Sequence, residues 1–178
     1  MQIMTLVGGL SAGAMVLANT DEITKVAEDA LGNVVKDLQV DAIQVTSARG
    51  HMQAGSLDRL VLTLETGGAS QAVWMNGTIV RLQGDEADVS ADLGDPGSPA
   101  TVRVLRDRDA SMKEHLLNSG DLVELTLDLP GEGPRFSGTE NLLVTFLPND
   151  ESVVEVRLKA PQHGAGSRLV EYDVDQRL

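Results

Sequence analysis

The pattern of apolar and polar positions divides the chain into two parts with different periodicity. The first twenty residues, MQIMTLVGGLSAGAMVLANT, contain no charged side chain. Beyond them, apolar residues recur at steps of three and four while charged residues fill the other positions, which is the pattern of an amphipathic helix. We therefore predict one continuous helix over residues 1–40. Its second half carries a single apolar stripe formed by Ile23, Ala27, Leu31, Val34 and Leu38.

The charge-free segment 1–20 has three interpretations. A cleaved signal peptide needs a basic n-region, and no basic residue precedes the apolar run. A membrane span needs about 20 apolar residues, and this segment is diluted by polar residues and glycines. A helix that is apolar on every side must be covered all round, and small residues let identical segments approach closely. We therefore predict a filament-core interface consisting of Ile3, Leu6, Val7, Gly9, Leu10, Gly13, Met15 and Leu17.

After residue 40 the periodicity changes to the alternation that is typical of strands. Alternating or β-rich runs predict strands at residues 57–65, 71–74, 78–82, 101–105, 122–129, 141–147 and 153–158, with a further candidate at 169–174. Asn76-Gly77 lies between two of these runs and predicts a hairpin. The acidic, turn-rich segment 84–99 is interpreted as a surface loop. The predicted fold class is α+β, with the helix of residues 1–40 followed by an antiparallel, immunoglobulin-like β-sandwich over residues 41–178.

Composition narrows the classes of function. The formal net charge is −13, and all of it falls on residues 21–178 because the first twenty are neutral. A surface of that sign repels phosphate backbones and anionic lipid headgroups, so we predict no nucleic-acid partner. The chain has no cysteine, which excludes disulfides, thiolate metal sites and cysteine nucleophiles. Only four aromatic residues are present, so the predicted core consists mainly of Leu, Val and Ile.

Several stretches resemble archaeal flagellins (archaellins), relatives of the type IV pilins. Residues 16–20, VLANT, stand where archaellins carry a VLINT-like sequence at the end of their hydrophobic segment. Residues 38–50, LQVDAIQVTSARG, resemble the family's passage from helix to first strand. Residues 116–129, LLNSGDLVELTLDL, place a Gly-Asp pair before an alternating strand, as archaellins do. Residues 140–148 and the Lys-Ala-Pro at 159–161 resemble the closing strands and terminal proline of the family.

This resemblance implies a structural subunit of the archaellum filament. Such a subunit polymerises through its N-terminal helix, residues 1–40, into a helical homopolymer for swimming motility, with residues 41–178 as the outer domain. The resemblance also implies an extracellular location, other archaellins as further partners, membrane contact only before assembly, and no cofactor. Three alternatives stay open: an adhesive type IV-like pilus subunit, a membrane-anchored accessory β-sandwich protein of the motility machinery, and a surface-anchored enzyme or ligand-binding domain.

The residues that could carry chemistry form no known catalytic motif. His51, His115 and His163 each stand alone on predicted loops, so we predict no enzymatic activity. The acidic segment 84–95 contains no calcium-loop signature and is interpreted as a solvated loop, with a cation site as the less favoured alternative. A second candidate cation site is Asp107, Asp109 and Glu114. Whether the chain binds a metal stays open.

Asn76-Gly77-Thr78 is the one N-x-Ser/Thr sequon in the sequence. A sequon on an exposed turn of an extracellular protein is a glycan acceptor, and archaellins are often glycosylated. The alternative is an Asn-Gly turn that happens to precede a threonine. Both interpretations of Asn76 stay open at this point.

Overall fold

The structure is a computed structural model that describes residues 43–67, 72–129, 131, 135–149, 153–161 and 168–176. The elements within these ranges are, in chain order, β1 (Ile43–Gln53), β2 (Ser56–Thr66), β3 (Val73–Trp74), β4 (Ile79–Gln83), β5 (Asp88–Asp92), β6 (Ala100–Arg106), the 3-10 helix η1 (Ser111–Glu114), β7 (Leu116–Leu117), β8 (Leu122–Asp128), β9 (Leu142–Leu147), β10 (Val154–Lys159) and β11 (Leu169–Asp175). They belong to one compact unit, Val40–Leu178.

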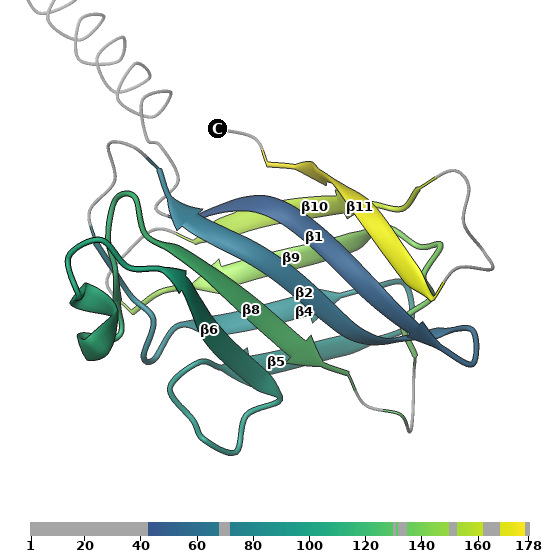
Figure 1. The fold of residues 1–178 in the computed structure, drawn as a ribbon. Coiled ribbons are helices and arrows are strands. Elements are labelled where there is room, and N and C mark those ends of the chain that lie inside the picture. The colour runs from purple at the N-terminus through teal and green to yellow at the C-terminus, as the bar shows by residue number, and fades with distance from the viewer. Residues whose placement is uncertain are drawn as a thin grey trace, which may run out of the picture. The chain divides into compact units, whose positions relative to one another are not determined.

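Nine of these strands form one antiparallel sheet in the order β5-β4-β9-β10-β11-β1-β2-β8-β6, while β3 and β7 form a separate two-stranded sheet. The large sheet is folded over on itself, so that β1, β2, β8 and β6 face β10, β9, β4 and β5 across the core (Figure 1). Strand β11 joins the two layers. Its residues Leu169–Tyr172 pair with β1, and Asp173–Asp175 pair with β10.

The predicted fold class, α+β with a two-sheet immunoglobulin-like sandwich, is therefore wrong. The elements of the described residues are all strands except one helix, η1, which has four residues. The predicted helix over 1–40 lies outside the described residues, together with the whole predicted filament-core interface and the apolar stripe. The two layers form one nearly closed sheet because β11 pairs with a strand of each layer. Alternation predicts which side chains face inward, but it contains no information on which strands share an edge.

The core follows the alternation of the strands, as predicted. In β2, Leu60, Leu62 and Leu64 are fully buried while the intervening positions face outward. Apart from two Phe, two Met and one Tyr side chain, the buried core is built of Leu, Val, Ile and Ala. Trp74 lies outside it and is half exposed. The predicted aliphatic core is thus confirmed. Within the described part of the chain, no helix has the length and apolar character needed to cross a membrane.

The predicted hairpin at Asn76-Gly77 is wrong. Strand β3 pairs with β7, whereas β4 pairs with β5 and β9. The Asn-Gly pair does form a tight turn, because Thr78 N–H donates to Met75 O (3.2 Å) and Gly77 has a φ of 80°. The buried Thr78 hydroxyl donates to Trp74 O (2.6 Å). This turn leads the chain from the small sheet into the large one instead of folding a strand back on its neighbour.

The predicted loop over residues 84–99 is wrong in part, because it contains β5. Val89 and Ala91 of β5 pack toward the core, while Asp88, Ser90 and Asp92 face solvent. Only two inward positions of β5 are apolar, and both side chains are small. The acidic residues therefore dominate the sequence pattern, and the alternation typical of a strand is weak. Acidic side chains on an edge strand disfavour its pairing with another acidic strand.

Candidate functional site

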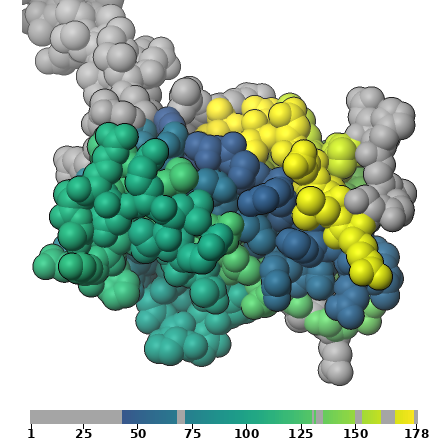
Figure 2. Space-filling view, viewed as in Figure 1, coloured from purple at the N-terminus to yellow at the C-terminus, as the bar shows by residue number. Residues whose placement is uncertain are grey.

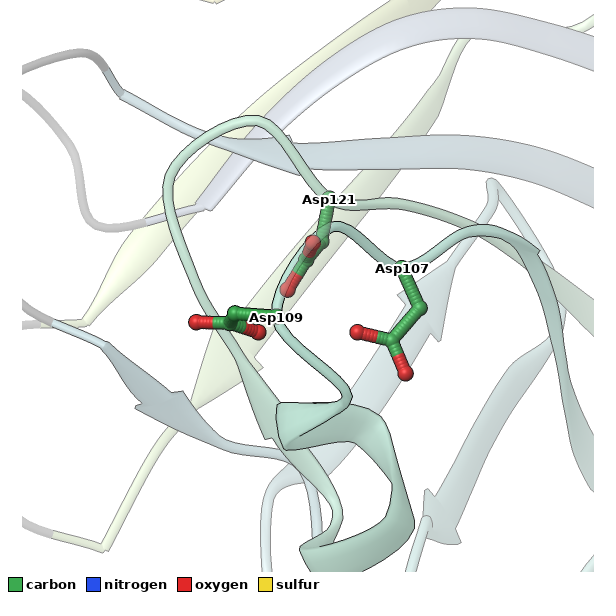
Figure 3. Close-up of side chains that lie close together, drawn as sticks. All are labelled: Asp107, Asp109 and Asp121. Carbon is green, nitrogen blue, oxygen red and sulfur yellow. The ribbon is translucent and has the colours of Figure 1, made fainter.

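Most of the predicted site residues cannot be located in this structure. The predicted filament-core residues, the stripe residues and His163 lie outside the described residues. His51 lies in β1, and His115 follows η1 with a left-handed backbone (φ 61°). Three aspartates of the β6–β8 connection bring their carboxylates close together (Figure 3).

These aspartates are Asp107, directly after β6, Asp109, two residues before η1, and Asp121, directly before β8. One carboxylate oxygen from each lies within 4.8 Å of the other two. Figure 3 shows the three side chains on the two loop segments, with Asp121 between Asp107 and Asp109 in this view. We refer to Asp107, Asp109 and Asp121 as the aspartate cluster.

Asp121 organises the loop around this cluster. It is fully buried, and its Oδ1 accepts a hydrogen bond from Arg108 N–H (2.8 Å). Its Oδ2 accepts from the Ser111 hydroxyl (3.0 Å) and from Asn118 N–H (3.1 Å). A buried carboxylate needs such partners, because an unpaired buried charge is strongly destabilising. Asp121 therefore ties the β6–η1 segment to the turn before β8.

Asp109 and Asp107 differ in their hydrogen bonding. Asp109 Oδ1 accepts from Ser111 N–H (3.0 Å) and its Oδ2 from Asn118 Nδ2 (2.7 Å). Hydrogen bonds from the side chains of Ser111 and Asn118 favour the ionised form and lower the pKa of Asp109. Asp107 is half-buried, and its Oδ1 is a buried oxygen that has no hydrogen-bond partner among the described residues.

Three convergent carboxylates are the donor type that hard divalent cations take in proteins. The structure brings together Asp107 and Asp109 of the sequence-based candidate cation site but not its third member, Glu114. Glu114 is exposed at the end of η1, and Asp121 takes the third place. The signal for Asp121 was its place in the Asn-Ser-Gly-Asp turn at the start of an alternating strand. A polar residue there either caps the turn or points back at the preceding loop.

Asn76 is exposed at the turn between β3 and β4. The turn is closely covered, because a Cβ on Gly77 would collide with the side chain of Asn149 and one on Gly94 would come within 3.0 Å of Gly77 N. Asn76 itself is exposed on this turn. This geometry is compatible with a glycan and with a bare turn, so it does not choose between the two interpretations.

A hollow of about 700 Å³ lies where β1 and β11 diverge. Its lining includes Ala48 and Tyr172, the last residues of the β1–β11 ladder at this end. Beyond them the Gln176 carboxamide replaces a strand neighbour, because its Nε2 donates to Ile43 O (2.6 Å) and its Oε1 accepts from Val45 N–H (3.0 Å). These two hydrogen bonds pair main-chain groups of Ile43 and Val45 at the edge of β1. We therefore interpret the hollow as the place where the β1–β11 ladder ends.

The sequence matches no protein-family model and no curated protein. Its fold is nevertheless similar to that of solved structures. The crystal structure of archaeal flagellin FlaB1 from Methanocaldococcus jannaschii has a TM-score of 0.61 at 14% identity, covering 73% of this chain and 95% of that chain. The archaeal flagellum of Methanospirillum hungatei strain JF1 has a TM-score of 0.52 at 9% identity, covering 96% of this chain and 94% of that chain.

A third similar structure is the archaellum periplasmic stator protein complex FlaF and FlaG from Sulfolobus acidocaldarius, at 12% identity, covering 67% of this chain and 90% of that chain. Its TM-score of 0.45 is too low to support an argument. The similarity to the two flagellin structures agrees with the archaellin resemblance of residues 16–20 and 116–129. At these identities the similarity concerns the fold, and the chain has the fold of an archaeal flagellin.

Proposed function

We propose that this chain is the structural subunit of an archaellum filament on the cell surface. The observation that carries the proposal is the combination of an archaeal flagellin fold with a charge-free segment over residues 1–20. Neither observation alone would support the proposal, because one fold serves many functions and apolar segments also occur in signal peptides and membrane anchors. Together they describe a domain that stays in solvent while its apolar end is covered by other copies.

Residues 1–20 form the contact that drives assembly in this proposal. Burying an apolar side chain contributes roughly 1.5–3 kcal/mol relative to water, but lipid already covers this segment before assembly. The net gain must therefore come from close packing between copies, which Gly9 and Gly13 permit because they have no side chain. Contacts of this kind are heterologous, head to tail, and such interfaces propagate into a filament instead of closing.

The finer parts of the proposal concern partners and location. The partners are further copies of this chain and other archaellins, the membrane is contacted only before assembly, and the filament is extracellular. The role needs no cofactor and no catalysis. With a net charge of −13, the outer domains stay soluble where many copies crowd together.

Electron microscopy of the cell surface tests this function. Deletion of the chain should remove long surface filaments and swimming while surface attachment remains. Retained swimming with lost attachment would favour the adhesive pilus. Unchanged filaments would refute both.

Glycine variants test the assembly contact. Gly9→Leu or Gly13→Leu should abolish filaments while the β-domain stays folded, because a leucine keeps neighbouring segments apart. The matched control is Gly131→Leu, at an exposed site where nothing lies within 4 Å of an added Cβ, and it should assemble normally. Normal filaments from both N-terminal variants would overturn close packing of residues 1–20.

A further inference from the structure

The two end strands of the large sheet are β5 and β6. Among the described residues each pairs with one neighbour only, β4 for β5 and β8 for β6. Every pairing in the nine-stranded order is antiparallel. Because nine is odd, strand direction is the same at both ends, and β5 runs parallel to β6. The two strands therefore offer complementary free edges with the same direction.

Hydrogen bonds at the strand ends identify which residues lie on the free edge of β6. Asp128 N–H donates to Pro99 O (2.8 Å), so that pair is hydrogen-bonded across β6 and β8. Antiparallel ladders alternate, hence Ala100, Val102 and Val104 turn their main-chain groups away from β8. The Ser98 hydroxyl accepts from Ala100 N–H (3.3 Å). The main-chain groups of Val102 and Val104 remain at the free edge.

Hydrogen bonds at the ends of the β4–β5 ladder likewise identify the residues on the free edge of β5. Gly84 N–H donates to Ala87 O (2.9 Å) and Leu93 N–H donates to Thr78 O (3.0 Å) at the two ends of the β4–β5 ladder. Alternation then places the main-chain groups of Asp88, Ser90 and Asp92 at the free edge. The side chains of these three residues face outward. On β6, in contrast, the free-edge residue Val102 packs its side chain against the core.

This difference in side-chain direction fixes how the two edges fit together. In a parallel ladder, a residue whose main-chain groups point at the partner lies opposite a residue whose groups point away from it. Ser90 then lies opposite an outward-facing residue such as Arg103, and the outer faces of both sheets coincide. An antiparallel pairing would set Ser90 opposite Val102 and join an outer face to an inner face. Parallel pairing of β5 with β6 is therefore the arrangement that continues the sheet.

The exposed side chains of β6 and the opposite charges of β5 and β6 also favour pairing between these two strands. Val104 and Leu105 of β6 are 45% and 41% exposed, and a long edge with exposed apolar residues is what monomeric proteins avoid. Strand β5 carries two carboxylates and no base, while β6 carries two guanidinium groups and no acid. Like charges disfavour β5 on β5 and β6 on β6, and opposite charges favour β5 on β6.

We propose that the free edge of β6 in one copy pairs in parallel with the free edge of β5 in a second copy of this chain, with Ser90 opposite Arg103. This inference rests on the proposed filament function and names a contact between outer domains. The two edges differ, so the contact is heterologous and propagates from copy to copy. In the central register, Asp88 and Asp92 flank Arg103 across the interface as diagonal neighbours. Within one chain Asp88 pairs with Arg81 and Arg103 pairs with Glu124, so the contact would extend these two ion pairs into one network.

Disulfide cross-linking tests this pairing, since the chain contains no cysteine of its own. Full-length Ser90→Cys and Arg103→Cys chains are co-expressed, one of them tagged, and the assembled cell-surface material is oxidised. Disulfide-linked dimers should form between the two variants and should be absent when either variant is present alone. The matched control pairs Ser90→Cys with Glu155→Cys, an exposed outward position on β10 within the sheet, and should give no linked dimer.

Two results would overturn the pairing. One is linkage in the control pair, or between like variants, at the level of the mixed pair. The other is the absence of linkage in filaments that otherwise assemble, which would leave the proposed function intact. Absence of filaments from unmodified cells would instead refute the proposed function and the pairing with it.

A proline variant gives a second measurement. Val102→Pro removes a main-chain donor at the free edge without touching the β8 ladder, a place where proline is tolerated. It should abolish the linked dimers while circular dichroism shows an intact β-domain. Linked dimers that persist in a folded Val102→Pro background would contradict main-chain pairing at this edge.

Discussion

Tyr172 provides a sharp test of the packing between β11 and the rest of the core. Its side chain is 6% exposed and its hydroxyl has no hydrogen-bond partner among the described residues. Burial, with a smaller contribution from the negative charge of Glu140, raises the pKa of Tyr172 from 10.0 to about 12. Because Tyr172 is the only tyrosine in the chain, tyrosinate absorbance reports on this one side chain.

The magnitude follows from the linkage between ionisation and folding. One pKa unit corresponds to ~1.4 kcal/mol, so the difference between 10.0 and about 12 amounts to at most about 2.7 kcal/mol. The folded pKa is the higher one, hence this stability is fully present below pH 10 and is lost as the pH rises toward 12. In Tyr172→Phe, the decrease in the free energy of unfolding between pH 10 and about pH 12 should be smaller by up to about 2.7 kcal/mol. At neutral pH the free energy of unfolding should rise by about 1 kcal/mol, because a buried unpaired hydroxyl is removed.

The assay combines spectrophotometric titration with urea denaturation of the full-length chain, kept monomeric in detergent, at neutral and alkaline pH. The titration should show tyrosinate forming well above its usual pH, and the two proteins should differ mainly in alkaline solution. A tyrosine that titrates at its ordinary value in the folded protein would refute the buried position of Tyr172. An identical alkaline loss in Tyr172→Phe would refute the linkage.

Three further predictions concern stability, each measured by urea denaturation. Asp121→Ala should lower the free energy of unfolding by about 3 kcal/mol, because three donors lose their acceptor. The control Glu114→Ala, at an exposed site, should change this free energy little. Equal effects of the two substitutions would contradict the role of Asp121. Gly50→Ala should cost about 1–3 kcal/mol because a Cβ there meets buried side chains, whereas Gly131→Ala has open space. Leu62→Ala should cost about 2–5 kcal/mol, since Leu62 is fully buried; a loss below 1 kcal/mol would contradict a packed core.

Strand positions were predictable wherever one face of the strand is apolar and the other polar. The run at residues 57–65 alternates in sequence, and β2 occupies Ser56–Thr66. Strand β5 was missed because its inward positions hold only Val89 and Ala91 between acidic residues. The pairing of strands was not predictable, since the Asn76-Gly77 turn is equally compatible with a hairpin and with a crossing to another sheet. The closure of two layers by β11 likewise depends on contacts between residues far apart in the sequence.

The aspartate cluster shows the same limit. Asp107 and Asp109 are neighbours in sequence and could be grouped by inspection. Asp121 is brought to them by the return of the chain through η1, and its burial and its hydrogen bonds to Arg108 and Asn118 exist only in the folded loop. Glu114 is closer to them in sequence, but it ends η1 on the exposed side.

Helical reconstruction of filaments sheared from the cell surface tests the central proposal most directly. The account predicts filaments built from this chain, with the β-domain of residues 43–176 at the periphery and residues 1–20 surrounded by the same segment of other copies. Filaments without this chain, or subunits whose first twenty residues are removed or lie away from the axis, would contradict it.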